Sequence, residues 1–281
     1  MTEPGFSSYP PCSTSHSTTS SGLPSSDRQM VSILTAVLSD GLVAVEAACA
    51  EALRQRPDRA AFVHAVTAHP FTQKTFGRLG YLPTALLLAY TPASLRFRSI
   101  GARPTGERGS VYYACKLLRP AAPQPVYLPE ALQPLVLPRA HDIGLPLQPQ
   151  PLPATPLQGS TDLQVQAEPA LNAAFLTLRH AGADLAPVLR RTLRQLCRAH
   201  IDVVYLSLDL GQRATGAACT EALGLGFIAA GLTPFMPWPA TLCLQYLNNQ
   251  TLEEARVCAV GPAAEELRSA VFTAYRAQEY L

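Results

Sequence analysis

One order of elements occurs twice in this chain, and it constrains the fold more than any other feature. Residues 61–89 begin with an apolar run, pass through turn residues and a short helical pattern, and reach the turn "RLGY" before a second apolar run. Residues 201–247 repeat that order, and their helical pattern ends at Gly224 and Gly226. Buried strands alternating with helices indicate an α/β protein. A repeat of this size indicates two related units in tandem.

The periodicity of apolar residues predicts the elements of both units. In the first unit we expect a helix over 72–79 and strands over 62–66, 84–90 and 112–118. In the second unit we expect a helix over 217–223 and strands over 163–166, 173–178, 201–208, 227–232, 241–247 and 257–260. A helix preceded by Asp184 as N-cap, with Pro187 in its first turn, is predicted to bury four leucines and to expose its arginines. The terminal segment 263–278 is predicted to be an amphipathic helix.

Four regions follow from composition and from the repeat. Residues 1–28 are rich in serine and proline and are predicted to be a disordered tail. Residues 29–120 form the first unit, which opens with a helical pattern over 29–56. Residues 121–160 are dense in proline and are predicted to be an extended connector, with a short helix within 127–143. Residues 161–281 form the second unit with its C-terminal helix.

Composition excludes several classes of function. The net charge is +2, so no strong field attracts nucleic acid or an anionic membrane surface. No apolar run approaches the ~20 residues of a membrane span, and no secretory signal is visible. The seven cysteines show no CxxC spacing, and no motif predicts a metal site. We therefore expect a cytoplasmic protein with reduced cysteines, no metal, no nucleic acid and no membrane.

The phrases "HAVTAHPFTQKTFGRLGY" and "EALGLGF" resemble the C-terminal half of the GNAT superfamily, the acyl-CoA-dependent N-acyltransferases. In that superfamily a buried strand leads into a short helix that ends in an "LGF" turn, and a further strand follows. The resemblance implies tandem GNAT-like mixed sheets flanked by helices, as in GNAT-like proteins of bacterial operons. It also implies that the first unit is N-terminally incomplete, because the elements that hold the cofactor pyrophosphate have no counterpart before it.

The resemblance places a cofactor loop between the strand 173–178 and the following helix. The superfamily loop reads Arg or Gln, two residues, Gly, one residue, then Gly or Ala, and it presents backbone N–H groups to the pyrophosphate at a helix N-terminus. Arg179, Gly182 and Ala183 are thereby implied to hold acyl-CoA. Asp184 departs from the pattern at its last position. Its carboxylate is expected to cap the same N–H groups and to repel a pyrophosphate, so a capped helix without CoA is the alternative.

The residues available for catalysis fit the superfamily incompletely. The candidates for a general base are His69, His180 and Asp209, and turn or helix capping explains His69 and Asp209 equally well. The superfamily tyrosine that protonates the leaving thiolate falls at Phe76 in the first unit and at Ala222 in the second. Neither side chain can donate a proton.

Two functions are therefore compatible with the sequence. The first is transfer of an acyl group from acyl-CoA to a small amine acceptor, with His69 or Asp209 assisting the amine. The second is a catalytically inactive, GNAT-derived binding or scaffold protein, a pseudoenzyme. Such a protein would pair with a protein partner or with a second copy of itself, because an incomplete sheet leaves an open edge.

Overall fold

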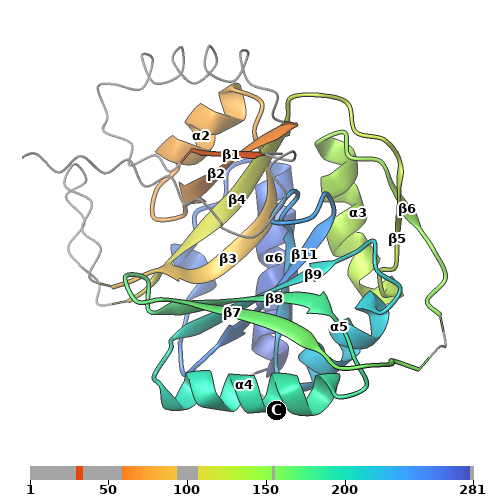
Figure 1. Ribbon diagram of the computed structural model, residues 1–281. Coiled ribbons are helices and arrows are strands. Elements are labelled where there is room, and N and C mark those ends of the chain that lie inside the picture. The colour runs from red at the N-terminus through yellow and green to blue at the C-terminus, as the bar shows by residue number, and fades with distance from the viewer. Residues whose placement is uncertain (1–29, 34–58, 94–106, 154–155, 279–281) are drawn as a thin grey trace, which may run out of the picture.

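A single nine-stranded mixed sheet forms the centre of the molecule and curls strongly across its width (Figure 1). The computed structural model describes residues 30–33, 59–93, 107–153 and 156–278. The strand order is β1-β2-β4-β3-β10-β11-β9-β8-β7. Helices flank the sheet, so the predicted α/β class is confirmed, and both repeated units contribute to the same sheet.

The repeated part of the first unit contributes three strands of this sheet and one helix. Its elements are β2 (Ala60–Val66), α2 (Phe71–Arg78), β3 (Leu82–Thr91) and β4 (Gly109–Leu117). Strand β4 lies between β2 and β3 and pairs antiparallel with both. Apolar side chains of β2 and β4 pack against Phe76 of α2, and Gly80 turns the chain into β3 with a φ of 82°. The predicted helix and strands of this unit are confirmed.

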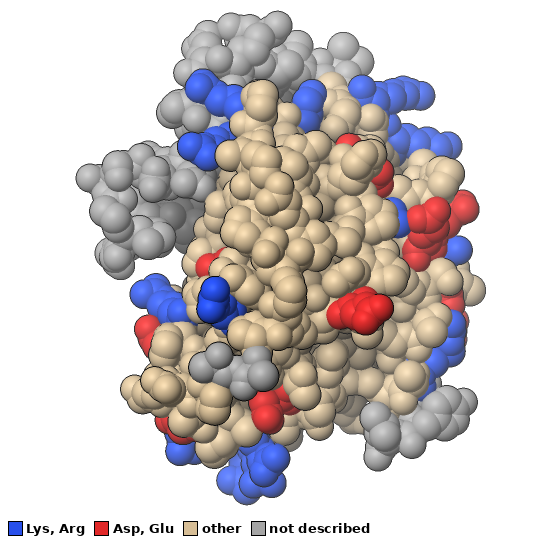
Figure 2. Space-filling model, turned by 90° about the vertical axis from the view of Figure 1, so that its right-hand side faces the viewer, with Lys and Arg blue, Asp and Glu red and all other residues tan. Residues whose placement is uncertain are grey.

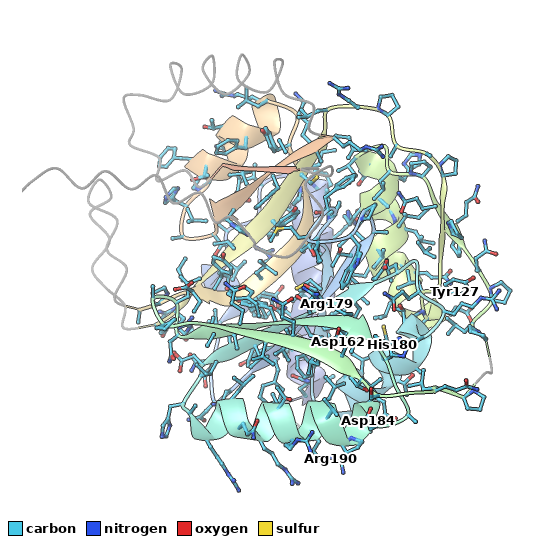
Figure 3. All side chains as sticks on the ribbon, in the orientation of Figure 1. Tyr127, Asp162, Arg179, His180, Asp184 and Arg190 are labelled. Carbon is cyan, nitrogen blue, oxygen red and sulfur yellow. The ribbon has the colours of Figure 1, made fainter. Side chains whose placement is uncertain are left out.

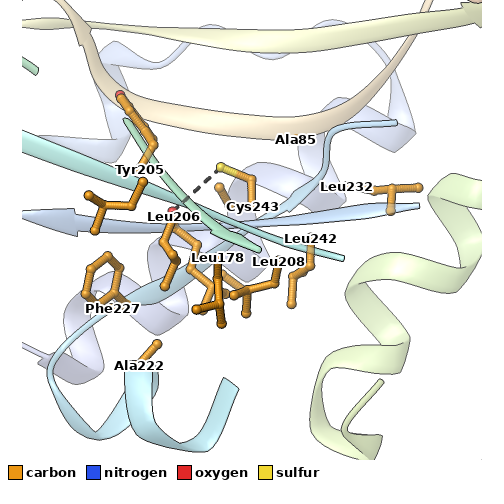
Figure 4. Packing of buried hydrophobic residues seen from close by; sticks show 14 of the residues in the cluster. Ala85, Leu178, Tyr205, Leu206, Leu208, Ala222, Phe227, Leu232, Leu242 and Cys243 are labelled. Atoms are coloured by element: carbon orange, nitrogen blue, oxygen red, sulfur yellow. Dashed lines mark hydrogen bonds between the residues drawn. The ribbon is translucent and has the colours of Figure 1, made fainter. Parts of the chain in front are cut away.

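The second unit repeats this topology. Its corresponding elements are β9 (Val203–Asp209), α5 (Thr215–Gly224), β10 (Ile228–Leu232) and β11 (Thr241–Leu247). Strand β11 lies between β9 and β10 and pairs antiparallel with both, as β4 does in the first unit. Figure 4 shows Leu206, Leu208 and Leu242 in the core on the side of the sheet that faces Ala222 of α5. The repeated order read from the sequence is thus also a repeated strand order.

Three further elements precede this repeat in the second unit, namely β7 (Asp162–Glu168), β8 (Ala173–His180) and α4 (Leu185–Arg198). Strand β8 pairs parallel with β9, and β7 pairs antiparallel with β8 at the edge of the sheet. Helix α4 crosses over between the two parallel strands. Its leucines are buried and its arginines Arg190, Arg191, Arg194 and Arg198 are exposed, as predicted.

The two units join through β3 and β10. These strands pair antiparallel, with Ala85 opposite Gly231. Gly231 has a φ of 127°, and a Cβ there would lie 2.4 Å from the carbonyl oxygen of Thr84, so only glycine fits this position without strain. Further along β3, the Gln245 side chain of β11 accepts from the N–H of Leu88 at 2.8 Å. The side chain of Gln245 thus takes the place of a backbone hydrogen bond beyond the β3–β10 pair.

The paired positions are equivalent in the repeat. Ala85 follows Tyr81 of "RLGY" by four residues, and Gly231 follows Phe227 of "GLGF" by four residues. Strands β3 and β10 occupy equivalent places in the two repeats and pair antiparallel at equivalent positions. Such a pairing has the geometry of a contact across a twofold axis. The strand order β2-β4-β3 therefore recurs as β9-β11-β10, and the two sets of strands meet at the β3–β10 pairing.

Two helices cover this junction from opposite sides. Helix α3 (Gln133–Asp142), preceded by the turn η1 (Glu130–Leu132), packs on the face of β3 that carries Ala85 and Leu87. Helix α6 (Pro262–Gln278) packs on the face that carries Leu86 and Leu88. The predictions of a short helix within 127–143 and of a terminal helix are confirmed.

Two secondary-structure predictions are wrong. Residues Met30–Ile33 form strand β1, parallel to β2, instead of the start of a helix. The long-range pairing with β2 overrides the local period, and the rest of the predicted helix, like the tail 1–28, lies outside the described residues. Residues 257–260 form no strand and follow the turn η2 (Glu254–Arg256). They cross the end of β2 instead, where Cys258 donates its N–H to the carbonyl of Thr67 at 2.9 Å.

The proline-dense segment contains two short extended strands, β5 (Gln124–Val126) and β6 (Leu147–Pro149), which pair parallel with each other beside α3. Figure 2 views the molecule from this side. Uncharged residues occupy the middle of the face, and acidic and basic residues are scattered around them, as the small net charge leads one to expect. No helix within the described ranges combines the length and the apolar character needed to cross a membrane.

Candidate functional site

The predicted cofactor loop connects the end of β8 to the start of α4. Strand β8 ends at His180 and α4 begins at Leu185, so the loop has the strand-to-helix setting that the resemblance requires. Figure 3 shows Arg179, His180 and Asp184 at this end of β8 and α4. The buried leucines of α4 hold its N-terminus beside the sheet.

The N–H groups of this loop are already bonded within the chain. Gly182 donates its N–H to Oγ1 of Thr161 at 3.1 Å, and Ala183 donates to the carbonyl oxygen of Gly159 at 2.9 Å. A Cβ at Gly182 would lie 2.4 Å from the backbone carbon of Ser160. The missing side chain therefore admits the segment 159–161, which precedes β7, against the loop. This segment takes the two donors that a pyrophosphate would need.

Asp184 holds the same segment from the other side. Its Oδ1 accepts the backbone N–H of Thr161 at 2.7 Å, and its side chain makes no capping bond to α4, although Asp184 occupies the N-cap position. Hydrogen bonds from Thr161 lower the pKa of the Asp184 carboxyl below its ordinary value. The prediction that this carboxylate caps the helix N–H groups is therefore wrong. The carboxylate instead accepts a hydrogen bond from the segment 159–161, which covers these N–H groups.

Arg179 and His180 also bond to neighbouring parts of the chain. Nη2 of Arg179 donates to Oε1 of Gln164 on β7 at 2.7 Å, and Nε2 of His180 lies 3.3 Å from the carbonyl oxygen of Gln158. Both side chains are exposed. The Arg179 guanidinium is thus engaged across the edge strands.

The strands beside the loop stay paired as far as Leu178 of β8 and Leu208 of β9. Strands β8 and β9 keep one parallel register from Ala173 opposite Val203 to Leu178 opposite Leu208. A cleft between splayed strands, which an acyltransferase would need for the arm of its cofactor, requires these strands to separate. Their side chains Leu178 and Leu208 are instead buried together in the core (Figure 4).

Asp209 lies at the end of β9 and organises the turn that follows. Its Oδ1 accepts the N–H of Gly211 at 2.9 Å, the local bond of an Asx turn, and its Oδ2 lies 3.4 Å from Nε2 of Gln212. The same amide nitrogen donates to the carbonyl oxygen of Arg179 at 3.2 Å, which connects this turn to the predicted cofactor loop. Partial burial raises the pKa of the Asp209 carboxyl.

His69 lies in the other half of the molecule, in the turn between β2 and α2. Its ring packs against Phe71 with a centroid distance of 5.4 Å, and burial lowers its pKa. In the sheet, β4, β3, β10 and β11 lie between β2 and β9. The structure therefore brings Arg179, Gly182, Ala183, Asp184 and Asp209 to one end of the second unit, while His69 belongs to the first.

Two features were not predicted from the sequence. The first is a cluster of aromatic rings that crosses from the first unit to the second. His64 stacks on Tyr90 at 4.7 Å, and Tyr90 contacts Tyr205, whose hydroxyl donates to the carbonyl oxygen of Leu88 at 2.7 Å. Burial lowers the pKa of His64 to about 4, so this ring is neutral at pH 7. The rings of Phe62 and Tyr113 also contact His64, whose side chain is half-buried at the edge of the core.

The second feature is a cavity of about 480 Å³ between α2 and the start of α6. Its lining is mostly apolar and comes from the first unit and from residues 260–264. No local motif marks it, because its walls come from segments that are distant in the sequence.

Within the described ranges, no group of three or more His, Cys, Asp or Glu residues is placed to hold a metal ion. The chain was also compared with models of protein families, with curated proteins and with solved structures, and none of them matches it.

Proposed function

We propose that this protein is a GNAT-derived binding protein that does not transfer acyl groups. The observation that carries the proposal is the bonding of the loop before α4, where Thr161 and Gly159 accept the N–H groups of Gly182 and Ala183. A pyrophosphate binds at such a loop through free backbone donors and the positive end of the helix dipole. Both donors are satisfied here by the chain itself.

The strand order supports descent from the same superfamily. The order strand, helix, strand, strand occurs in both units, and each "LG" turn ends a helix and leads into the third element. A duplicated half that joins its copy through β3 and β10 would complete the first unit's sheet on that side. Among the described residues, β1 and β7 are the edge strands of the sheet, and we propose these edges for pairing with another chain.

The positions of the superfamily's proton donor also support loss of transfer. Phe76 and Ala222 occupy these positions, and both are buried apolar residues. The hydroxyl of Tyr205, the tyrosine on the strand before α5, donates to a backbone carbonyl inside the core. None of these groups can protonate a leaving thiolate.

One observation favours the alternative, an acyl-CoA-dependent acyltransferase acting on a small amine. Asp209 has a raised pKa, lies at the end of a buried strand, and is connected through Gln212 to the predicted cofactor loop. A carboxylate in this position can take a proton from an amine. Transfer would require the segment 159–161 to leave the loop so that acyl-CoA could enter.

Isothermal titration calorimetry with acetyl-CoA and a longer acyl-CoA distinguishes the two functions. We expect no binding by the wild type. Asp184→Gly removes the bond to Thr161 and the charge beside the loop, and we expect weak binding to appear in this variant. Asp142→Gly, at the end of α3, is the control and should behave as the wild type. Micromolar binding by the wild type, followed by turnover of an amine, would establish the acyltransferase instead.

A further inference from the structure

The cavity between α2 and α6 has the size and lining of a site for a small molecule. Its volume of about 480 Å³ lies within the range of small-molecule pockets. Its lining includes Ala65, Phe76, Tyr112 and Ala114, which are buried at 1–5% exposure and come from β2, α2 and β4. The floor of the cavity is therefore apolar and belongs to the packed core.

The opposite wall is held in place by one glutamine. Gln73 of α2 donates through Nε2 to the carbonyl oxygen of Cys258 at 2.8 Å, and its Oε1 accepts the N–H of Val260 at 3.0 Å. These two bonds fix the segment that leads to Gly261 and the first turn of α6, which complete the lining. The cavity is thus bounded by hydrogen-bonded backbone instead of by a loose loop.

Two cations, Lys74 and Arg78, line the cavity from α2. They are four residues apart, so they lie on the same face of the helix, where like charges repel. Both side chains are exposed, and within the described ranges neither forms an ion pair. An anion placed between them would relieve this repulsion. The adjoining first turn of α6 contributes a partial charge of the same sign.

We propose that this cavity binds a small monoanion with an apolar body, of the class of medium-chain or aromatic carboxylates. The apolar body lies on Phe76, Tyr112 and Ala114, and the carboxylate lies at the mouth between Lys74 and Arg78. The site is separate from the loop before α4. It goes beyond the proposed function and does not depend on it.

Titration of the full chain with sodium octanoate, followed by calorimetry, tests the site. We expect saturable binding of one octanoate per chain and at least tenfold weaker binding of octanamide, which has the same body without the charge. Lys74→Gln with Arg78→Gln should weaken octanoate binding at least tenfold. The matched control is Arg194→Gln with Arg198→Gln, two exposed cations with the same spacing on α4, which should leave binding unchanged.

A second pair of variants tests the cavity itself. Gly77 lines the cavity, and a Cβ there would meet no atom within 4 Å, so Gly77→Leu places a side chain in open space at the site while favouring the helix. We expect this variant to fold and to lose octanoate binding. Gly224→Leu makes the same change in equally open space on α5 and should bind normally. Absence of saturable binding by the wild type, or binding that survives Gly77→Leu, would overturn the proposal.

Discussion

Gly182 illustrates how one residue can serve opposite purposes in the same motif. In a phosphate-binding loop, glycine lets a ligand approach the backbone. Here the absent side chain lets Ser160 approach instead, and the neighbouring Thr161 and Asp184 hold that contact with hydrogen bonds. The glycine in the sequence predicts that another group comes close to the backbone at residue 182. It does not identify that group as residues 159–161, because they lie outside the loop motif 179–184.

At the residue scale, we predict that His64 makes stability depend on pH. The pKa of His64 is about 4 in the folded chain, because burial disfavours the charged ring, whereas the ordinary pKa of histidine is 6.5. Between these values the unfolded chain binds a proton that the folded chain does not, so stability is lost as pH falls from 6.5 towards 4. The loss is at most about 3 kcal/mol.

The measurement is urea denaturation of the wild type and of His64→Phe between pH 7 and pH 4. Phenylalanine keeps a ring against Tyr90 and removes the titrating group. The stability difference between the two proteins should change steadily in favour of the variant as pH falls. Parallel curves would mean that the folded protein tolerates a charged His64.

At the scale of elements, prediction succeeded where local pattern and tertiary pairing agree. The strands and helices of both repeats were predicted because their apolar runs and glycine turns lie within short windows. Prediction from the sequence failed at two places. Strand β1 depends on its pairing with β2, some 30 residues away, and residues 257–260 are held by the side chain of Gln73. For the same reason the cavity between α2 and α6 could not be predicted.

The join between β3 and β10 yields the prediction at this scale. Gly231→Ala places a Cβ about 2.4 Å from the carbonyl oxygen of Thr84 and forces alanine to a φ of 127°. We expect a loss of about 2 kcal/mol or more in the free energy of unfolding, from strain and displacement of the paired strand.

Urea denaturation again provides the measurement, with Gly77→Ala as the matched control. Gly77 lies in helix α2 with open space around its Cβ position, so this change should stabilise the protein by about 0.5–1 kcal/mol. If Gly231→Ala proved as harmless as Gly77→Ala, β3 and β10 would not be in close contact.

At the scale of the whole molecule, the two units share one sheet and are joined by an ion pair whose arginine is buried. Arg108, 8% exposed, bonds to Asp202 of the second unit at 2.8 Å, to the carbonyl oxygen of Leu171 at 2.6 Å, and to that of Ala89 on β3 at 2.8 Å. One guanidinium thereby satisfies acceptors from both units. We therefore expect this contact to couple the unfolding of the two units.

We predict that Arg108→Met lowers the free energy of unfolding by about 3 kcal/mol, because it leaves buried acceptors without their donor. Arg256→Met is the control. Arg256 pairs with Glu107 at 2.7 Å and with Glu253 at 2.8 Å, but all three side chains are exposed, so its loss should destabilise the protein much less than the loss of Arg108. Equal effects of the two changes in urea denaturation would show that Arg108 does not join the units.

Amide hydrogen exchange at Gly182 and Ala183, followed by NMR with and without coenzyme A, tests most directly whether the loop before α4 is closed. Both amides are donors to Thr161 and Gly159, so they should exchange slowly in the free protein, and their chemical shifts should not move when coenzyme A is added. Fast exchange in the free protein, together with shifts of both amides on addition of coenzyme A, would contradict the closed loop and establish a cofactor site.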